Sequence, residues 1–158
     1  MAWTASKVFS AFVTDSFNKT KGFSLSGDTI EAALFADSIT PDATVTSANS
    51  AYGAGVWASG GVSDASGWPA LGRPLASLSS TFTTNVYKFT AANTASANST
   101  TTLSACNGAL VYDHTTTSPA GVTDQGICFN YFGGPNSVSN GTFTIAWDGT
   151  NGIFKITL

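Results

Sequence analysis

From Thr81 to the C-terminus, short strand-like segments alternate with turn-rich ones, and this arrangement constrains the fold more than any other feature of the chain. The segments have ordinary strand lengths and are separated by residues such as Gly, Asn and Asp. We expect strands at Thr81–Thr90, Thr101–Cys106, Ala109–Asp113, Ile127–Phe132, Thr142–Trp147 and Ile153–Leu158. With one earlier strand, this predicts a mainly β protein: a β-sandwich or partly open barrel of about seven short antiparallel strands.

The N-terminal part carries the one helical pattern. Between Ser6 and Asn18 apolar residues recur at three- and four-residue steps. This spacing predicts one short amphipathic helix with Ser6 as its N-cap and Gly22 after its end. The first strand is expected at Thr29–Phe35, where alternating residues indicate one buried face.

The end of the chain has the clearest hairpin pattern. Two alternating segments within Thr142–Leu158 flank Asp148-Gly149-Thr150-Asn151-Gly152, whose Asp-Gly and Asn-Gly steps supply the positive φ angles that tight turns need. The pattern predicts that the two segments pair with each other and are integral to the sheet. A resemblance of the turn to part of a calcium loop is less convincing, because the closing Glu and other ligands are missing.

Length and composition indicate one folded domain. The 158 residues contain 9% charged and 42% hydrophobic residues, a balance that excludes charge-driven disorder. Residues 1–158 are expected to form a single domain, with 1–22 as an N-terminal arm and helix and 23–158 as the β domain.

The stretch from Ala36 to Leu71 is long for a loop and is punctuated by Gly and Pro. It is therefore either functional or contains a short strand around Gly55–Ala58. Its aromatic residues Tyr52, Trp57 and Trp68 are expected to be exposed.

Charge and hydropathy limit the partners. The net charge is −3, and the six cations form no basic stripe that could neutralise phosphates, so nucleic acid is not expected as a partner. No run approaches the ~18 apolar residues of a membrane span, and the first residues lack a basic segment followed by an apolar one. We expect a protein made in the cytoplasm with no membrane partner.

Few side chains suit catalysis. The chain has one histidine, His114, one glutamate, Glu31, and scattered aspartates, but 20 Ser and 23 Thr. No familiar zinc site or acid–base pair can be recognised in this set. We expect no enzyme activity, no metal and no cofactor.

The two cysteines, Cys106 and Cys128, both fall in expected strands. A disulfide is geometrically allowed if their Cα atoms come within ~7 Å. Two buried thiols are favoured, since a reducing cytosol disfavours a disulfide.

Several segments, taken in order, resemble the head decoration or minor capsid proteins of tailed bacteriophages, which are small virion structural proteins. The resemblance covers most of Phe23–Leu158. It rests on Gly27–Phe35, Thr40–Asp42, the aromatic and glycine-rich stretch ending Gly72-Arg73-Pro74-Leu75, Gly108–Asp113 and Gly141–Asp148.

This resemblance implies a protein that binds the outer surface of an icosahedral shell and clamps capsid subunits against the pressure of packed DNA. Its partners would be the major capsid protein and neighbouring copies of itself. Its location would be the capsid exterior of the virion, after synthesis in the host bacterial cytoplasm. We expect the contact surface on the Gly53–Gly72 loop, with Tyr52 beside it, and around Trp3.

Two other interpretations remain. A phage tail or fibre component would have a similar composition. A carbohydrate-binding module would use Tyr52, Trp57 and Trp68 to stack on sugar rings, with surface glycans as its partner.

Overall fold

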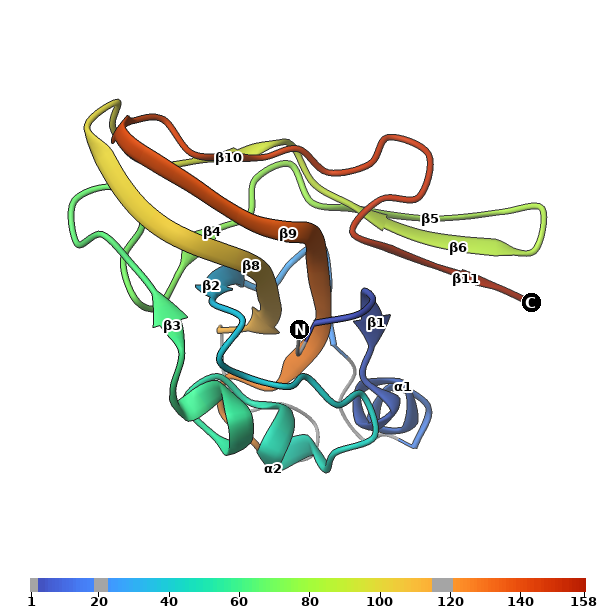
Figure 1. Ribbon diagram of the computed structural model, residues 1–158. Helices are drawn as coiled ribbons and strands as arrows, with labels where there is room; N and C mark the ends of the chain where they lie inside the picture. The colour runs from blue at the N-terminus through green and yellow to red at the C-terminus, as the bar shows by residue number, and fades with distance from the viewer. Residues whose placement is uncertain (1–2, 19–22, 115–120) are drawn as a thin grey trace.

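The computed structural model describes residues 3–18, 23–114 and 121–158. Within them the chain is mainly β, with antiparallel sheets and two short α-helices, which confirms the predicted fold class. The described strands form three separate sheets and do not close into a barrel. The largest sheet occupies the body above the helices, and a smaller sheet projects to one side (Figure 1).

The main sheet has six strands. Its path runs β1-β9-β8-β2-β3, and β4 also pairs with β2. The strands are β1 (Lys7–Val8), β9 (Gly126–Gly141), β8 (Thr101–Asp113), β2 (Ile30–Phe35), β3 (Gly61–Val62) and β4 (Arg73–Pro74).

The predicted strand at Thr29–Phe35 is present as β2, but the expectation of one buried face was wrong. Ala32, Ala33, Leu34 and Phe35 are all buried, so both faces of β2 are covered. Its edges pair with β8 and with β3 and β4, and core side chains cover its faces, as where Phe35 packs on the Trp57 ring at 5.0 Å.

The strand β8, which pairs with β9, is longer than predicted. Thr101–Cys106 and Ala109–Asp113 are one strand, β8, because Asn107 and Gly108 continue it. Only glycine fits at position 108, because a Cβ atom there would lie 2.4 Å from the Trp3 ring and would clash with it. Register shifts near Cys106 bend the pair, as β-bulges do.

Two small sheets complete the β-structure. β7 (Thr94–Ala95) pairs with β10 (Thr144–Ile145). The other sheet has the order β11-β6-β5 and is formed by β5 (Ser79–Thr83), β6 (Val86–Thr90) and β11 (Phe154–Thr157). We call this projecting three-stranded sheet the arm.

The predicted single strand Thr81–Thr90 was wrong, because it contains a reversal. Thr84 and Asn85, with φ values of 50° and 63°, form a two-residue turn between β5 and β6. Positive φ at both positions is the hairpin geometry that matches strand twist. This turn could not be predicted from the sequence, since Thr rarely adopts a positive φ and no Gly marks the turn.

The predicted terminal hairpin was also wrong in its pairing. β10 pairs with β7, and β11 pairs with β6, so the two segments contact earlier parts of the chain instead of each other. The turn itself is present. The Asp148 carboxylate accepts hydrogen bonds from the backbone N–H groups of Thr150 and Asn151, and Gly152 N donates to Asp148 O at 2.7 Å.

The helices differ from the expected ones. The first, α1 (Ser10–Phe17), begins after β1, which takes Lys7 and Val8 from the predicted helix. Ser6 is therefore not its N-cap; its Oγ accepts a hydrogen bond from Tyr131 N. Gly22 lies outside the described residues.

The stretch Ala36–Leu71 is more ordered than a loop. It contains α2 (Ser47–Ser50), a 3-10 helix η1 (Gly55–Ala58) and β3. The short strand expected around Gly55–Ala58 is thus helical, and the strand follows at Gly61–Val62.

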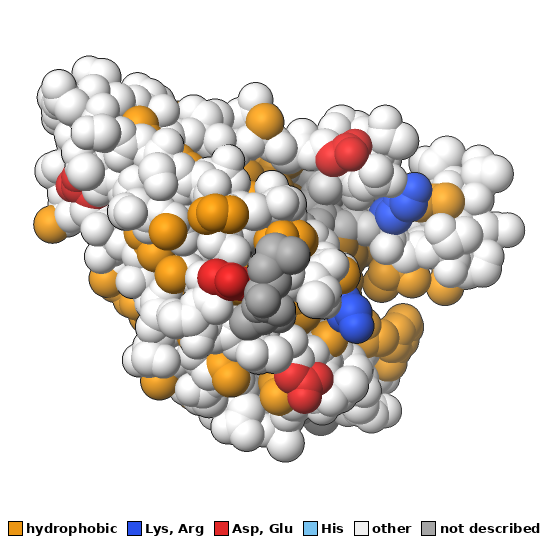
Figure 2. All heavy atoms as spheres, viewed as in Figure 1, with side chains coloured by type: hydrophobic (Ala, Val, Ile, Leu, Met, Phe, Trp, Pro, Cys, Tyr) orange, Lys and Arg blue, Asp and Glu red, His pale blue; other side chains and the backbone are white. Residues whose placement is uncertain are grey.

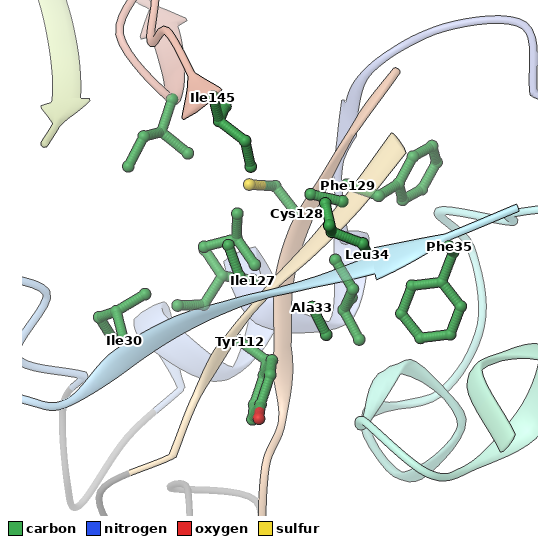
Figure 3. Close-up of a cluster of buried hydrophobic side chains, with 14 of the residues drawn as sticks. Ile30, Ala33, Leu34, Phe35, Tyr112, Ile127, Cys128, Phe129 and Ile145 are labelled. Carbon is green, nitrogen blue, oxygen red and sulfur yellow. The ribbon is translucent and has the colours of Figure 1, made fainter. Parts of the chain in front are cut away.

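One hydrophobic core joins these elements. It extends from Trp3 to Phe154 and includes Phe9 and Phe12, so the N-terminal segment packs into the same core as the sheets. Figure 3 shows its centre, where side chains of β2, β8, β9 and β10 converge.

Candidate functional site

Trp3 and Trp57 are core residues, so the expectation that both bind a partner was wrong, as was the expectation that Trp57 is exposed. Their exposed fractions are 1% and 2%. The rings meet edge to face with centroids 5.9 Å apart, and Trp57 also packs on Phe35 at 5.0 Å. Trp3 Nε1 donates to Ala36 O at 3.0 Å. The glycine-rich stretch folds back through η1 and buries the Trp57 ring.

Trp68 is also wrongly expected at the surface. It has an exposed fraction of 0%, its Nε1 donates to Ala32 O at 3.1 Å, and its ring lies edge to face with Phe143 at 5.7 Å. The turn before it is fixed by Asp64. Hydrogen bonds from Thr102 N and from Ser66 to its carboxylate lower the Asp64 pKa to about 2.

Tyr52 lies half-buried and apart from these tryptophans. Its ring stacks on Tyr112 at 5.1 Å, and its hydroxyl donates to Ala70 O at 2.9 Å. Burial raises the pKa of Tyr52. The four predicted partner-binding residues therefore form no common surface: Trp3 and Trp57 are buried together, Tyr52 reaches the same cluster only through Phe35, and Trp68 packs elsewhere on Phe143.

His114 pairs with an aspartate. Its Nδ1 lies 2.7 Å from Asp124 Oδ1, and this hydrogen bond is the main cause of a raised His114 pKa. The ring also meets Tyr112 edge to face at 5.9 Å. Tyr112 donates to Leu71 O, and Glu31 Oε2 lies 3.3 Å from the same hydroxyl. The described residues contain no group of three or more His, Cys, Asp or Glu placed to hold a metal ion.

Cys106 and Cys128 are both buried free thiols. Burial raises the pKa of Cys106 to about 11 and raises the pKa of Cys128 as well. Thiols held in the protonated form are poor nucleophiles, so both act as small apolar side chains.

The arm carries the most exposed large hydrophobic side chain of the described strands. Phe82 is 60% exposed on β5. It stands opposite Tyr87 on β6, which in turn stands opposite Ile156 on β11. Directly paired residues share a face of a sheet, so these three side chains form one apolar row. We call it the arm row, and the sequence missed it because the hairpin was hidden.

The arm row continues into the core. Phe89 and Phe154 lie on the same face, with ring centroids 5.6 Å apart, and Phe154 packs on Phe12 of α1 at 6.2 Å. The arm's apolar face is therefore anchored at its base and open at its tip. Figure 2 shows apolar side chains along the projecting lobe.

A groove of about 540 Å³ separates the main sheet from the C-terminal segment. Figure 2 shows this hollow beside the projecting lobe, with Lys or Arg side chains on both sides. Rings, amides and cations line it, including Tyr131, Trp147, Asn130, Asn151, Lys7 and Lys155. Trp147 is partly buried, and its Nε1 donates to Thr94 Oγ1 at 3.1 Å, which fixes the ring.

Comparisons of the chain with protein-family models, with curated proteins and with solved structures gave no match. In the described part of the chain, neither α-helix has the length and apolar character needed to cross a bilayer.

Proposed function

We propose that this chain is a bacteriophage virion structural protein that binds the outer capsid surface as a decoration protein and stabilises the head. The observation that carries the proposal is the arm row, in which exposed Phe82 lies beside the partly buried Tyr87 and Ile156 on a sheet that projects from the body. An exposed ring beside other apolar side chains is typical of a protein interface. The sequence resemblance to decoration proteins supplies the class of partner.

The arm suits a repeated contact with a shell. Phe82 lies near its projecting tip, while Phe89 and Phe154 at its base are buried in the core. Each contact can be modest, because copies bound around an icosahedral shell act together.

Three aspartates of the described chain have structural roles. The carboxylates of Asp42, Asp64 and Asp148 each accept hydrogen bonds from nearby backbone N–H groups. Such bonds stabilise turns and lower the pKa values of these groups. These acids therefore shape the surface loops.

Binding to undecorated heads tests the proposal. Purified protein is mixed with particles lacking it, and bound copies are counted after sedimentation. Phe82→Ser should weaken binding by about 2 kcal/mol, roughly thirtyfold, if the ring is an interface anchor. Phe17→Ser is the matched control, because Phe17 is an exposed ring on α1, outside the arm and outside the Gly53–Gly72 loop.

Three outcomes count against the proposal. Wild-type protein that never binds heads removes the decoration function, and loss of the protein from tail-less particles would assign it to the tail or a fibre. Equal binding by Phe82→Ser and wild type would remove the arm row from the interface.

A second candidate function, carbohydrate binding, is favoured by the groove. Rings beside amides and cations are typical of saccharide sites, and Trp147 is the tryptophan that lines this groove. Because Trp3, Trp57 and Trp68 are buried, a saccharide in the groove should change mainly the fluorescence of Trp147. Titration of host surface polysaccharide should give a saturable change that Trp147→Phe abolishes. No change in the wild type would exclude this candidate.

A further inference from the structure

β5 is an edge strand whose outer side is unpaired in the described structure. It has none of the features that usually prevent edge-to-edge pairing. All five of its residues, Ser79–Thr83, are exposed. It pairs with β6 on one side, and it is the end strand of the arm. Natural edge strands usually carry a charge, a proline or a bulge that prevents pairing. Neither β5 nor the following turn, Thr84–Asn85, contains a charged residue or a proline.

The turn determines which backbone groups of β5 point outward. In a hairpin with a two-residue turn, the residues next to the turn form a hydrogen-bonded pair, here Thr83 and Val86. Hydrogen-bonded pairs alternate with non-hydrogen-bonded ones along an antiparallel ladder. Ser80 and Phe82 are thus in non-hydrogen-bonded pairs with β6, and their N–H and C=O groups face away from the arm.

We propose that β5 pairs antiparallel with β5 of a second copy of this chain, around a two-fold axis through Thr81. In this register all five residues of each strand are paired, and Ser80 lies opposite Phe82 of the second copy. Ser80 and Phe82 are the residues whose backbone groups point outward. The register that pairs all five residues therefore also places these groups where they can hydrogen-bond to the second copy. The result is a continuous six-stranded sheet.

The side chains fit a second copy. Thr81 would lie opposite Thr81, and threonine pairs across strands are favourable. Phe82 would lie opposite the small Ser80, which leaves room for the ring. No charged residues are opposed, because β5 has none. A two-fold contact needs such a self-complementary surface.

The other edge of the arm is less suited to this contact. β11 lines the groove through Phe154 and Lys155, and the groove's opposite wall includes Lys7 and Val8 of β1. Figure 1 shows β11 nearer to β1 and β5 on the far side of the arm. The open edge is therefore β5.

This inference goes beyond the proposed function and does not depend on it, since pairing is tested without capsids. Analytical ultracentrifugation of the full chain should show a concentration-dependent dimer. Ser80→Pro removes an outward N–H and leaves the ladder to β6 intact, so it should abolish the dimer and keep cooperative melting. Ser80→Ala is the matched control and should still dimerise. A wild type that stays monomeric at every accessible concentration would overturn the proposal.

Cysteine cross-linking tests the register. Thr81 and its symmetry mate would form a non-hydrogen-bonded pair with Cβ atoms about 4.5 Å apart, close enough for a disulfide. Thr81→Cys should therefore give a covalent dimer on mild oxidation. Thr83→Cys, also exposed and on the same face, should not, because it would lie opposite Ser79. The native Cys106 and Cys128 are buried in both variants.

The outcomes are distinct. Cross-linking at position 81 alone supports the proposed pairing. Cross-linking of neither variant, or of both at the same rate, contradicts it. Because these measurements use purified protein, their failure would leave the result of the head-binding experiment unaffected.

Discussion

At the residue scale, Trp57 shows how aromatic rings hold this fold together. Its indole packs against Trp3, Phe9, Phe35 and Phe129, with ring centroids 5.0–6.1 Å apart. Aromatic pairs at such distances contribute beyond the area that they bury. The buried Nε1 of Trp57 has no hydrogen-bond partner in the structure, so the ring contributes through packing.

Trp57→Ala should lower the free energy of unfolding by about 3–5 kcal/mol, because it leaves a large cavity in the core. Trp57→Phe should cost less, since it keeps an aromatic ring and removes an unpaired N–H. Val56→Ala, at an exposed position in the same η1 helix, is the control and should change little. Urea denaturation measures all three. A small effect of Trp57→Ala would contradict the buried position.

The His114–Asp124 pair should make stability depend on pH. The folded-state pKa of His114 is raised above its usual 6.5, mainly by the hydrogen bond to Asp124. A raised pKa means that the stabilisation is fully present below the unfolded pKa and is lost as pH rises through the folded one. The pair is partly exposed, so its contribution is at most about 1 kcal/mol.

Asp124→Asn removes the charge partner and tolerates the positive φ of 56° at this position. The wild type should therefore be more stable than this variant near pH 5.5, and the difference should shrink by pH 8.5. Denaturation at both pH values measures it. A difference that grows with pH would show that the pair does not raise the His114 pKa.

At the element scale, the hairpin turn decides where the arm reverses. Thr84 has a φ of 50°, a conformation that β-branched residues rarely adopt. Asn is favoured at the first central position of such a turn. Thr84→Asn should thus raise the free energy of unfolding by about 0.5–1 kcal/mol. Thr83→Asn, placed in the strand itself, should not stabilise, and equal effects of the two would argue against this turn.

The C-terminal strand should be essential to the arm. Ile153 and Phe154 are buried, and β11 forms one side of the arm through its ladder to β6. Deletion of residues 153–158 removes that ladder and two buried side chains worth ~1.5–3 kcal/mol each. The shortened chain should lose most of a stability that is typically about 5–15 kcal/mol. Removal of exposed Leu158 alone is the control, and cooperative melting of the longer deletion at the wild-type temperature would contradict the prediction.

The elements show what periodicity can and cannot predict. Ile30–Phe35 was found because Ile30, Ala32 and Leu34 alternate with Glu31 and Ala33, and turn residues precede them. The partner strands of β10 and β11, which are β7 and β6, could not be predicted, since alternation gives a strand's faces and says nothing of its neighbours. The burial of Trp57 and Trp68 was missed because a glycine-rich stretch can fold back onto a core as readily as it can extend into solvent. The arm row could not be predicted because it is formed by a hairpin whose turn, Thr84–Asn85, contains no glycine.

At the scale of the whole molecule, the body and the arm tip differ in how they are held. Leu110 and Val111 of β8 are fully buried in a strand that pairs on both sides. Thr83 of β5, at the edge of the arm, is exposed. Local opening requires little free energy where few apolar groups are buried. The arm tip should therefore open without unfolding of the body.

Amide hydrogen exchange on the isolated protein should resolve this difference. Under native conditions the Thr83 and Val86 amides, which belong to the ladder next to the turn, should exchange faster than those of Leu110 and Val111. The β8 amides should exchange only through global unfolding, so their free energy of opening should equal that measured by denaturation. Equal protection at the arm tip and in β8 would show that the molecule opens as a single unit. In that case the arm would be as rigid as the body, and its docking surface would be fixed before any partner binds.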